Sequence, residues 1–132
     1  MLRIGTGAVS WRSKLQSIVA TSTTEAEYIA AFDAGQEICW MRNLLTEFGY
    51  DMSQPSTLHM DNQSAIATSK HPEHHGRMKH LDLRFYWLRD VVEKGLLDVK
   101  YIPTTHMVAD LLSIPLTGAL VKESWTMLGL QT

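Results

Sequence analysis

Apolar residues recur along the chain with either the period of a strand or the period of a helix, and this period predicts which element each segment forms. Over residues 1–14, β-branched and aromatic residues flank a turn marked by Gly5 and Gly7, which predicts a hairpin of two strands. The run SIVATS, residues 17–22, is rich in the same residue types and predicts further strand. The amino-terminal part of the chain is therefore expected to be β-structure.

A long helix is the strongest feature of the pattern. Between residues 22 and 49 the apolar residues recur at helical spacing, which predicts a helix of about seven turns. Ser22 and Glu25 have the spacing of a capping box at its start. Gly49 fits the position just past its end, where glycine is favoured.

The rest of the chain continues the alternation of strands and helices. The pattern predicts a strand at 57–60, a helix at 62–69, a polar loop at 70–80, a helix at 81–95, a strand at 96–102 and helices at 105–113 and 118–130. In the 81–95 helix, Leu81, Phe85, Leu88 and Val92 form the apolar stripe. The order predicts an α/β domain with a mixed sheet, antiparallel at its start and parallel afterwards.

Composition sets the class of protein. The 132 residues, 45% hydrophobic and 20% charged, predict one globular domain over 1–132. The net charge of −2 means that any nucleic-acid footprint must be local. The single cysteine, Cys39, excludes an internal disulfide. No apolar run approaches the length of a membrane span, and the start resembles no signal peptide, so we expect no membrane association and an intracellular location, cytoplasmic or nuclear.

Asp61 directly follows the predicted strand 57–60, at the edge where α/β sheets usually carry their active sites. The alternative is that Asp61 only caps the helix that follows. Glu27 lies in the first turns of the long helix, above a line of small residues, Ala30, Ala31 and Ala34, that would let the helix press closely on the sheet. The alternative for Glu27 is a solvated acid that complements the helix dipole.

Asp110 is the third acid of interest, because apolar residues surround it in the run VADLL. A charge among such neighbours needs a partner or a metal, unless it is a first-turn acid of a helix. Carboxylates that converge raise each other's pKa unless a cation lies between them. Oxygen ligands suit Mg²⁺ or Mn²⁺, and two such ions about 3.5–4 Å apart are a common device for cleaving phosphodiesters.

Four stretches of the chain carry a resemblance to a known family. VSWRSKLQSIVATSTTEAEY, MDNQSAIA, HHGRMKHLDLRFYWLRDVVEKG and VADLLSIPL resemble the ribonuclease H domain of Ty1/copia-type retrotransposon polyproteins, from about Ala8 to the final LGL. The resemblance implies an RNase H-like fold that hydrolyses the RNA strand of RNA–DNA hybrids, with Mg²⁺ or Mn²⁺ held by four acids. Three of the four fall on Glu27, Asp61 and Asp110.

The chain departs from the family at its start. The family begins with a central strand that carries the first metal-binding aspartate, in a stretch like SDADW, whereas the first acid here is Glu25. We therefore expect hydrolysis to be weakened or lost, and exposed sheet edges to invite a homodimer or a rearranged sheet. Two other interpretations stay open: a catalytically inactive module that binds nucleic acid or protein, and a fragment of a larger polyprotein whose missing strand lies upstream.

Residues 70–84 form the one local basic footprint of the chain. If the chain binds a hybrid duplex, we expect these basic residues to contact its phosphates: Lys70, His75, Arg77, Lys79, His80 and Arg84. The alternative is a solvated loop. A zinc site built from His71, His74, His75 and His80 is disfavoured, because the spacing fits no standard structural site and Cys39 is the only thiol.

Overall fold

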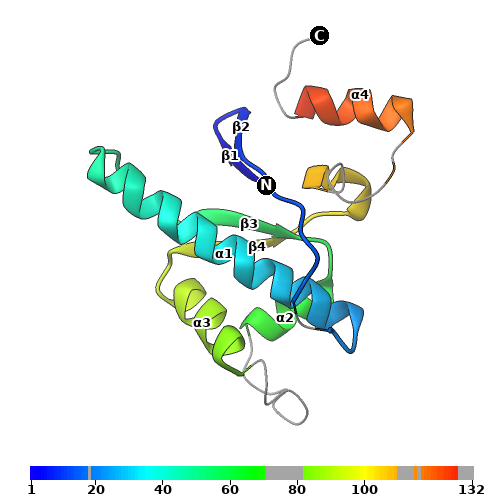
Figure 1. Cartoon of the computed structure of the whole chain (residues 1–132). Coiled ribbons are helices and arrows are strands. Elements are labelled where there is room, and N and C mark those ends of the chain that lie inside the picture. The colour runs from blue at the N-terminus through cyan, green and yellow to red at the C-terminus, as the bar shows by residue number, and fades with distance from the viewer. Residues whose placement is uncertain (18, 71–81, 110–114, 116, 128–132) are drawn as a thin grey trace. The chain divides into compact units, whose positions relative to one another are not determined.

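The computed structural model describes residues 1–17, 19–70, 82–109, 115 and 117–127 (Figure 1). In chain order its elements are β1 (Leu2–Ile4), β2 (Gly7–Ser10), α1 (Thr23–Glu47), β3 (Ser56–Met60), α2 (Gln63–Lys70), α3 (Asp82–Glu93), β4 (Leu97–Tyr101), the 3-10 helix η1 (Thr104–His106) and α4 (Gly118–Met127). The chain divides into two compact units, residues 20–102 and residues 1–19 with 103–132. Within the described ranges, no helix is long and apolar enough to cross a membrane.

The predicted hairpin forms, but it is shorter than expected. β1 and β2 pair antiparallel, and Gly5 makes the turn with a φ of 60°, a conformation that glycine adopts without strain. The expected strand beyond Ser10, including the described residues of 17–22, is wrong. A strand needs a neighbour for its backbone hydrogen bonds, and β1 spans only three residues. β2 therefore ends where its partner ends.

The long helix is confirmed, with both ends close to the predicted positions. Ser22 is the N-cap of α1, and its hydroxyl oxygen accepts from the backbone N–H of Glu25 at 3.1 Å. Gly49, with a φ of 85°, follows the last turn. The N–H of Gly49 donates to the carbonyl of Thr46 and that of Tyr50 to the carbonyl of Leu45, which is a Schellman ending.

β3 and β4 form a parallel pair joined by a crossover through α2 and α3. Their register runs from Ser56 opposite Leu97 to Met60 opposite Tyr101. The antiparallel and parallel pairs of the expected mixed α/β fold are thus both present, as two separate two-stranded sheets in the described residues. The absent central strand would stand between two such pairs, so the arrangement is consistent with an RNase H-like fold that lacks this strand.

The core lies in the 20–102 unit. Its buried apolar residues are Tyr28, Ile29, Ala31, Ile38, Leu58, Met60, Ala65, Leu88, Val91, Leu97 and Val99. α1 presses on this core at Gly35, where an added Cβ would lie 3.1–3.3 Å from side-chain atoms of Trp87, Leu88 and Leu97. The close approach expected from the small-residue line therefore occurs, but through Ala31 and Gly35, whereas Ala30 is exposed.

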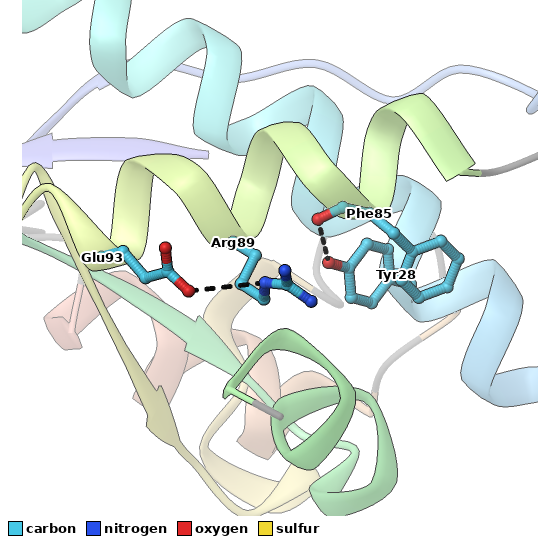
Figure 2. A network of polar contacts seen from close by, with 4 residues as sticks. All are labelled: Tyr28, Phe85, Arg89 and Glu93. Carbon is cyan, nitrogen blue, oxygen red and sulfur yellow. Dashed lines mark hydrogen bonds and ion pairs between the residues drawn. The ribbon is translucent and has the colours of Figure 1, made fainter. Parts of the chain in front are cut away.

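Aromatic contacts join α3 to α1. Tyr28 stacks on Phe85 with ring centroids 3.8 Å apart, and its hydroxyl donates to the Phe85 carbonyl at 3.2 Å (Figure 2). Burial raises the pKa of Tyr28 well above its ordinary value, against a smaller opposing effect of Arg89, so the hydroxyl stays a donor. Phe32 meets Trp87 edge to face, with the ring centroids 5.1 Å apart.

The predicted apolar stripe of α3 is confirmed in part. Leu88 is fully buried, but Val91 is more deeply buried than the expected Val92, and Leu81 lies outside the described residues. The helix expected at 105–113 appears in its described part as a 3-10 turn, and the remainder, from 110, is outside that part. α4 confirms the last predicted helix between Gly118 and Met127.

Candidate functional site

Asp61 lies at the carboxyl end of the parallel pair, as the sequence predicts. It directly follows Met60, the last residue of β3, and is partly exposed. The ladder ends at this point, since the N–H of Ile102 donates to the Met60 carbonyl at 2.9 Å. The chain then turns into α2. Asp61 thus occupies the position in a βαβ unit where ligands usually bind.

The side chain of Asn62 caps α2. The Asn62 side-chain oxygen accepts from the N–H of Ala65 at 3.1 Å, and its carbonyl accepts from the N–H of Ile66 at 3.1 Å. The α2 cap seen in the structure is thus Asn62, and the metal-binding role of Asp61 stays a prediction. Both residues of the DN pair are good caps, and the sequence alone gave no way to choose between them.

The start of α1 lies beside the end of β3. The Asn62 amide nitrogen lies 3.5 Å from the Thr24 hydroxyl, which it contacts as a long hydrogen bond. Glu27 follows Thr24 by three residues, close to one helical turn, and is partly buried. The structure therefore brings together the two elements that carry the predicted acids Glu27 and Asp61.

Glu25 has a different role from Glu27, although the two are neighbours in sequence. Its carboxylate is buried and accepts from the backbone N–H and the hydroxyl of Thr21, at 2.6 and 2.5 Å. These bonds, the hydroxyl first, hold the pKa of Glu25 below its ordinary value. Half of the expected capping box is therefore wrong, because the acid binds Thr21 rather than the N–H of Ser22.

The third predicted acid, Asp110, lies outside the described residues. Within the part that the structure describes, no three histidine, cysteine, aspartate or glutamate side chains are grouped as a metal site. Glu27 and Asp61 offer carboxylate oxygens, the ligand type that Mg²⁺ and Mn²⁺ prefer. The two described carboxylates are thus of the ligand type that suits these ions. A third ligand would have to come from Asp110.

The basic footprint is described only at its two ends. Residues 71–81, and with them His75, Arg77, Lys79 and His80, lie outside the described residues, and Lys70 is the last residue of α2. The guanidinium carbon of Arg84 lies 5.4 Å from the ring centroid of Phe32. Its Nη1 is buried with no hydrogen-bond partner in the described part of the chain. The phosphate-binding role of these residues stays a prediction.

Sequence reasoning missed Arg42, which is 7% exposed on the inner side of α1. Its guanidinium donates to the carbonyls of Met52 and Gln54 and to the hydroxyl of Ser56. These bonds fix the loop that leads into β3, and so the strand that presents Asp61. A signal was available, since Arg42 follows the apolar Ile38 by four residues on the same helical stripe.

The chain is similar to retrovirus-related Pol polyproteins of plant transposons. It is 46% identical over 107 residues to that of transposon TNT 1-94 from Nicotiana tabacum, which covers 81% of this chain. The Pol polyproteins of transposons RE2 and RE1 from Arabidopsis thaliana are 38% and 36% identical over 114 residues, or 86% of this chain.

This chain spans only 8% of the length of each of these relatives. No protein-family model matches the chain. No solved structure matches it either. The matches support an origin in a Ty1/copia-type retrotransposon Pol polyprotein, of which the chain corresponds to one short segment.

Proposed function

We propose that the chain is a ribonuclease H domain derived from a retrotransposon Pol polyprotein, with hydrolysis weakened or lost. Its substrate would be the RNA strand of an RNA–DNA hybrid. One observation carries the proposal: Asp61 follows the last residue of β3, and the contact of Asn62 with Thr24 sets this strand end beside the start of α1, the helix that carries Glu27. The similarity to Pol polyproteins supports the same interpretation.

The protein groups have distinct tasks in this proposal. Glu27, Asp61 and Asp110 would hold Mg²⁺ or Mn²⁺ through their carboxylates. The bound ions would supply a deprotonated water and stabilise the charge that develops on the phosphate. Asn62 and Thr24 join the two elements that carry the first two acids. The basic residues of 70–84 would contact phosphates and so position the duplex.

Three of the family's four acids have counterparts in residues 1–132, so this chain itself would offer the ions three carboxylates. An incomplete ligand set leaves the ions poorly held, and their charge is the main source of transition-state stabilisation. A second candidate function is therefore a nucleic-acid-binding module without hydrolysis. The basic residues of 70–84 are the sequence feature that supports it.

Cleavage of a labelled RNA–DNA hybrid in Mg²⁺ and then in Mn²⁺ tests the proposal. Asp61→Asn keeps the shape of the side chain and removes its charge, so we expect any cleavage to fall by at least about a hundredfold. Asp90→Asn is the matched control, because Asp90 is an exposed acid of α3 that pairs with Lys94. The control should cleave like the unchanged protein.

The outcomes separate the two candidate functions. Cleavage lost in Asp61→Asn and kept in Asp90→Asn supports the ribonuclease. No cleavage in any variant, with hybrid bound more weakly as salt rises, supports the binding module. Equal cleavage by both variants would refute a role for Asp61 and would indicate a contaminating nuclease.

A further inference from the structure

The guanidinium of Arg84, between α3 and α1, has a buried end that nothing accepts from. Its Nη1 is the one buried side-chain nitrogen or oxygen without a hydrogen-bond partner in the described part of the chain. The guanidinium carbon lies 5.4 Å from the ring centroid of Phe32 on α1. The face of an aromatic ring attracts a cation weakly and does not replace an oxygen acceptor. The buried end of Arg84 therefore lacks the partner that its N–H groups need.

The helix positions around Arg84 supply no carboxylate. The positions one turn from Phe32 on α1, and one turn after Arg84 on α3, carry no acid. They are Tyr28, Ile29, Gly35, Gln36, Trp87 and Leu88. The helix α2, which packs against α3, has no acidic residue between Gln63 and Lys70. These positions therefore offer Arg84 no ion pair.

The position of Arg84 is unfavourable for a cation unless an anion joins it. A buried donor that has lost water and gained no acceptor destabilises a fold, and a charged donor does so more strongly. Arg84 is also the third residue of α3, where the helix dipole is positive. The residue as a whole is only partly buried. Its long stem can therefore turn the guanidinium outward to meet an anion at the surface.

The sequence before α3 favours an anion that comes from outside the chain. Residues 70–81 contain seven lysine, arginine or histidine residues and a single acid, Glu73. Such a composition attracts anions and offers few internal partners for a further cation. Among anions, a phosphate group presents two oxygens in the geometry that the planar fork of a guanidinium matches. Phosphate is therefore the ligand chemistry that fits Arg84 best.

We propose that Arg84 binds a phosphate group, which draws its guanidinium away from the ring of Phe32. In the bound state Nη1 donates to a phosphate oxygen, so the ligand supplies the missing acceptor. The inference rests on the proposed function for the source of the phosphate, because the backbone of a nucleic acid would provide it. Inorganic phosphate offers the same chemistry, and the experiment below separates the two sources. Hydrolysis is not required for either.

Thermal unfolding in inorganic phosphate tests the site by itself. A ligand that binds the folded protein raises its melting temperature, and sodium chloride at equal ionic strength is the reference. Arg84→Met keeps the length of the side chain and removes its donors. We expect this variant to bind phosphate about tenfold more weakly than the unchanged protein. Arg89→Met is the matched control, because Arg89 lies on the same helix and has Glu93 as a partner at 3.5 Å (Figure 2).

The stability of the two variants without phosphate is a second, independent readout. Arg84→Met removes a buried donor that has no acceptor, so its melting temperature should equal or exceed that of the unchanged protein. A merely structural contact between Arg84 and Phe32 would give the opposite result, a lower melting temperature. Circular dichroism checks that both variants keep the fold.

Binding of a labelled RNA–DNA hybrid to the same proteins identifies the source of the phosphate. We expect Arg84→Met to weaken hybrid binding about tenfold relative to Arg89→Met. Binding of phosphate without binding of the hybrid would support the site at Arg84 and count against the proposed function. The inference is overturned if phosphate stabilises none of these proteins, or if it stabilises Arg84→Met and Arg89→Met equally. It is also overturned if Glu73→Gln destabilises the unchanged protein but not Arg84→Met, because a carboxylate of this chain would then be the partner.

Discussion

Glu25 and Glu27 lie two residues apart at the start of α1, and they differ in burial. Glu25 is buried and accepts two hydrogen bonds from Thr21. Glu27 is partly buried and follows Thr24, whose hydroxyl contacts Asn62, by three residues. The hydrogen bonds from Thr21 make Glu25 part of the structure that holds the helix start, and the metal-binding role of Glu27 stays a prediction.

The bonds to Thr21 predict an acid-sensitive contribution to stability. The folded pKa of Glu25 lies below its ordinary value of 4.5, so the stabilisation is present above pH 4.5 and is lost as the pH falls through the folded pKa. Thr21→Val removes the hydroxyl donor and keeps the shape. We expect it to lower the free energy of unfolding by about 1 kcal/mol at pH 7, and by progressively less below pH 4.5.

Urea unfolding at a series of pH values measures this difference. Thr23→Val is the matched control, since it makes the same change two residues on and leaves the bonds of Glu25 in place. A loss that is the same for both variants, or one that does not change with pH, would show that the Thr21 hydroxyl does not hold the carboxylate.

At the scale of elements, the close approach of α1 to the strands depends on a residue without a side chain. A Cβ at Gly35 would lie 3.1 Å from a ring atom of Trp87 and 3.2 and 3.3 Å from methyl groups of Leu97 and Leu88. Interiors are packed too densely to absorb such contacts without movement. Gly35 therefore sets the distance between α1 and the elements that it covers.

Gly35→Val should destabilise the protein through this contact. Overpacking of a dense core costs about 1–3 kcal/mol, and we expect a loss of that size beyond the loss caused by Ala30→Val. Ala30 is exposed on the same helix, so Ala30→Val carries a helix-propensity penalty without crowding, whereas Gly35→Val carries no such penalty; a larger loss at Gly35 therefore reports the crowding. Denaturant midpoints of the two variants give the comparison. Equal midpoints would mean that the neighbours of Gly35 move aside freely.

Elements with strong local signals were predictable, and those that depend on distant partners were not. The caps of α1 at Ser22 and Gly49 are local, and both were predicted. The extent of β2 depends on the length of β1, so strand character alone overestimated it. At the site, the position of Asp61 was predictable from the strand before it. The bonds of Arg42 to the loop were missed, because that loop lies ten or more residues away along the chain.

At the scale of the whole molecule, the core belongs to the same unit as two of the three candidate acids, Glu27 and Asp61. The fully buried apolar side chains of the described residues all lie in 20–102, with Glu27 and Asp61. The described residues of the other unit leave Trp11, Leu15 and Val19 exposed. The backbone that presents the two acids is therefore held by the best-packed part of the protein, and the expectation of one domain over 1–132 stays a prediction.

The outer edge of β3 predicts that the molecule pairs with a second copy. Ser56 donates to the carbonyl of Leu96, so the N–H groups of Thr57 and His59, which alternate with it, face away from β4. No strand in the described residues pairs with that edge. Open edges of this kind recruit further strands. We expect sedimentation velocity to show a dimer whose population rises with protein concentration.

His59→Pro removes one outward donor without touching the ladder to β4, and should shift the chain to monomer. His59→Val keeps the N–H and should stay dimeric, which separates the backbone donor from the imidazole. Circular dichroism of both variants checks that the parallel pair is kept. A dimer that survives in His59→Pro would place the contact elsewhere, whereas a monomer at every concentration in the unchanged protein would mean that the β3 edge is protected. Loss of the dimer in His59→Pro alone would show that the unpaired backbone groups of the β3 edge drive the association.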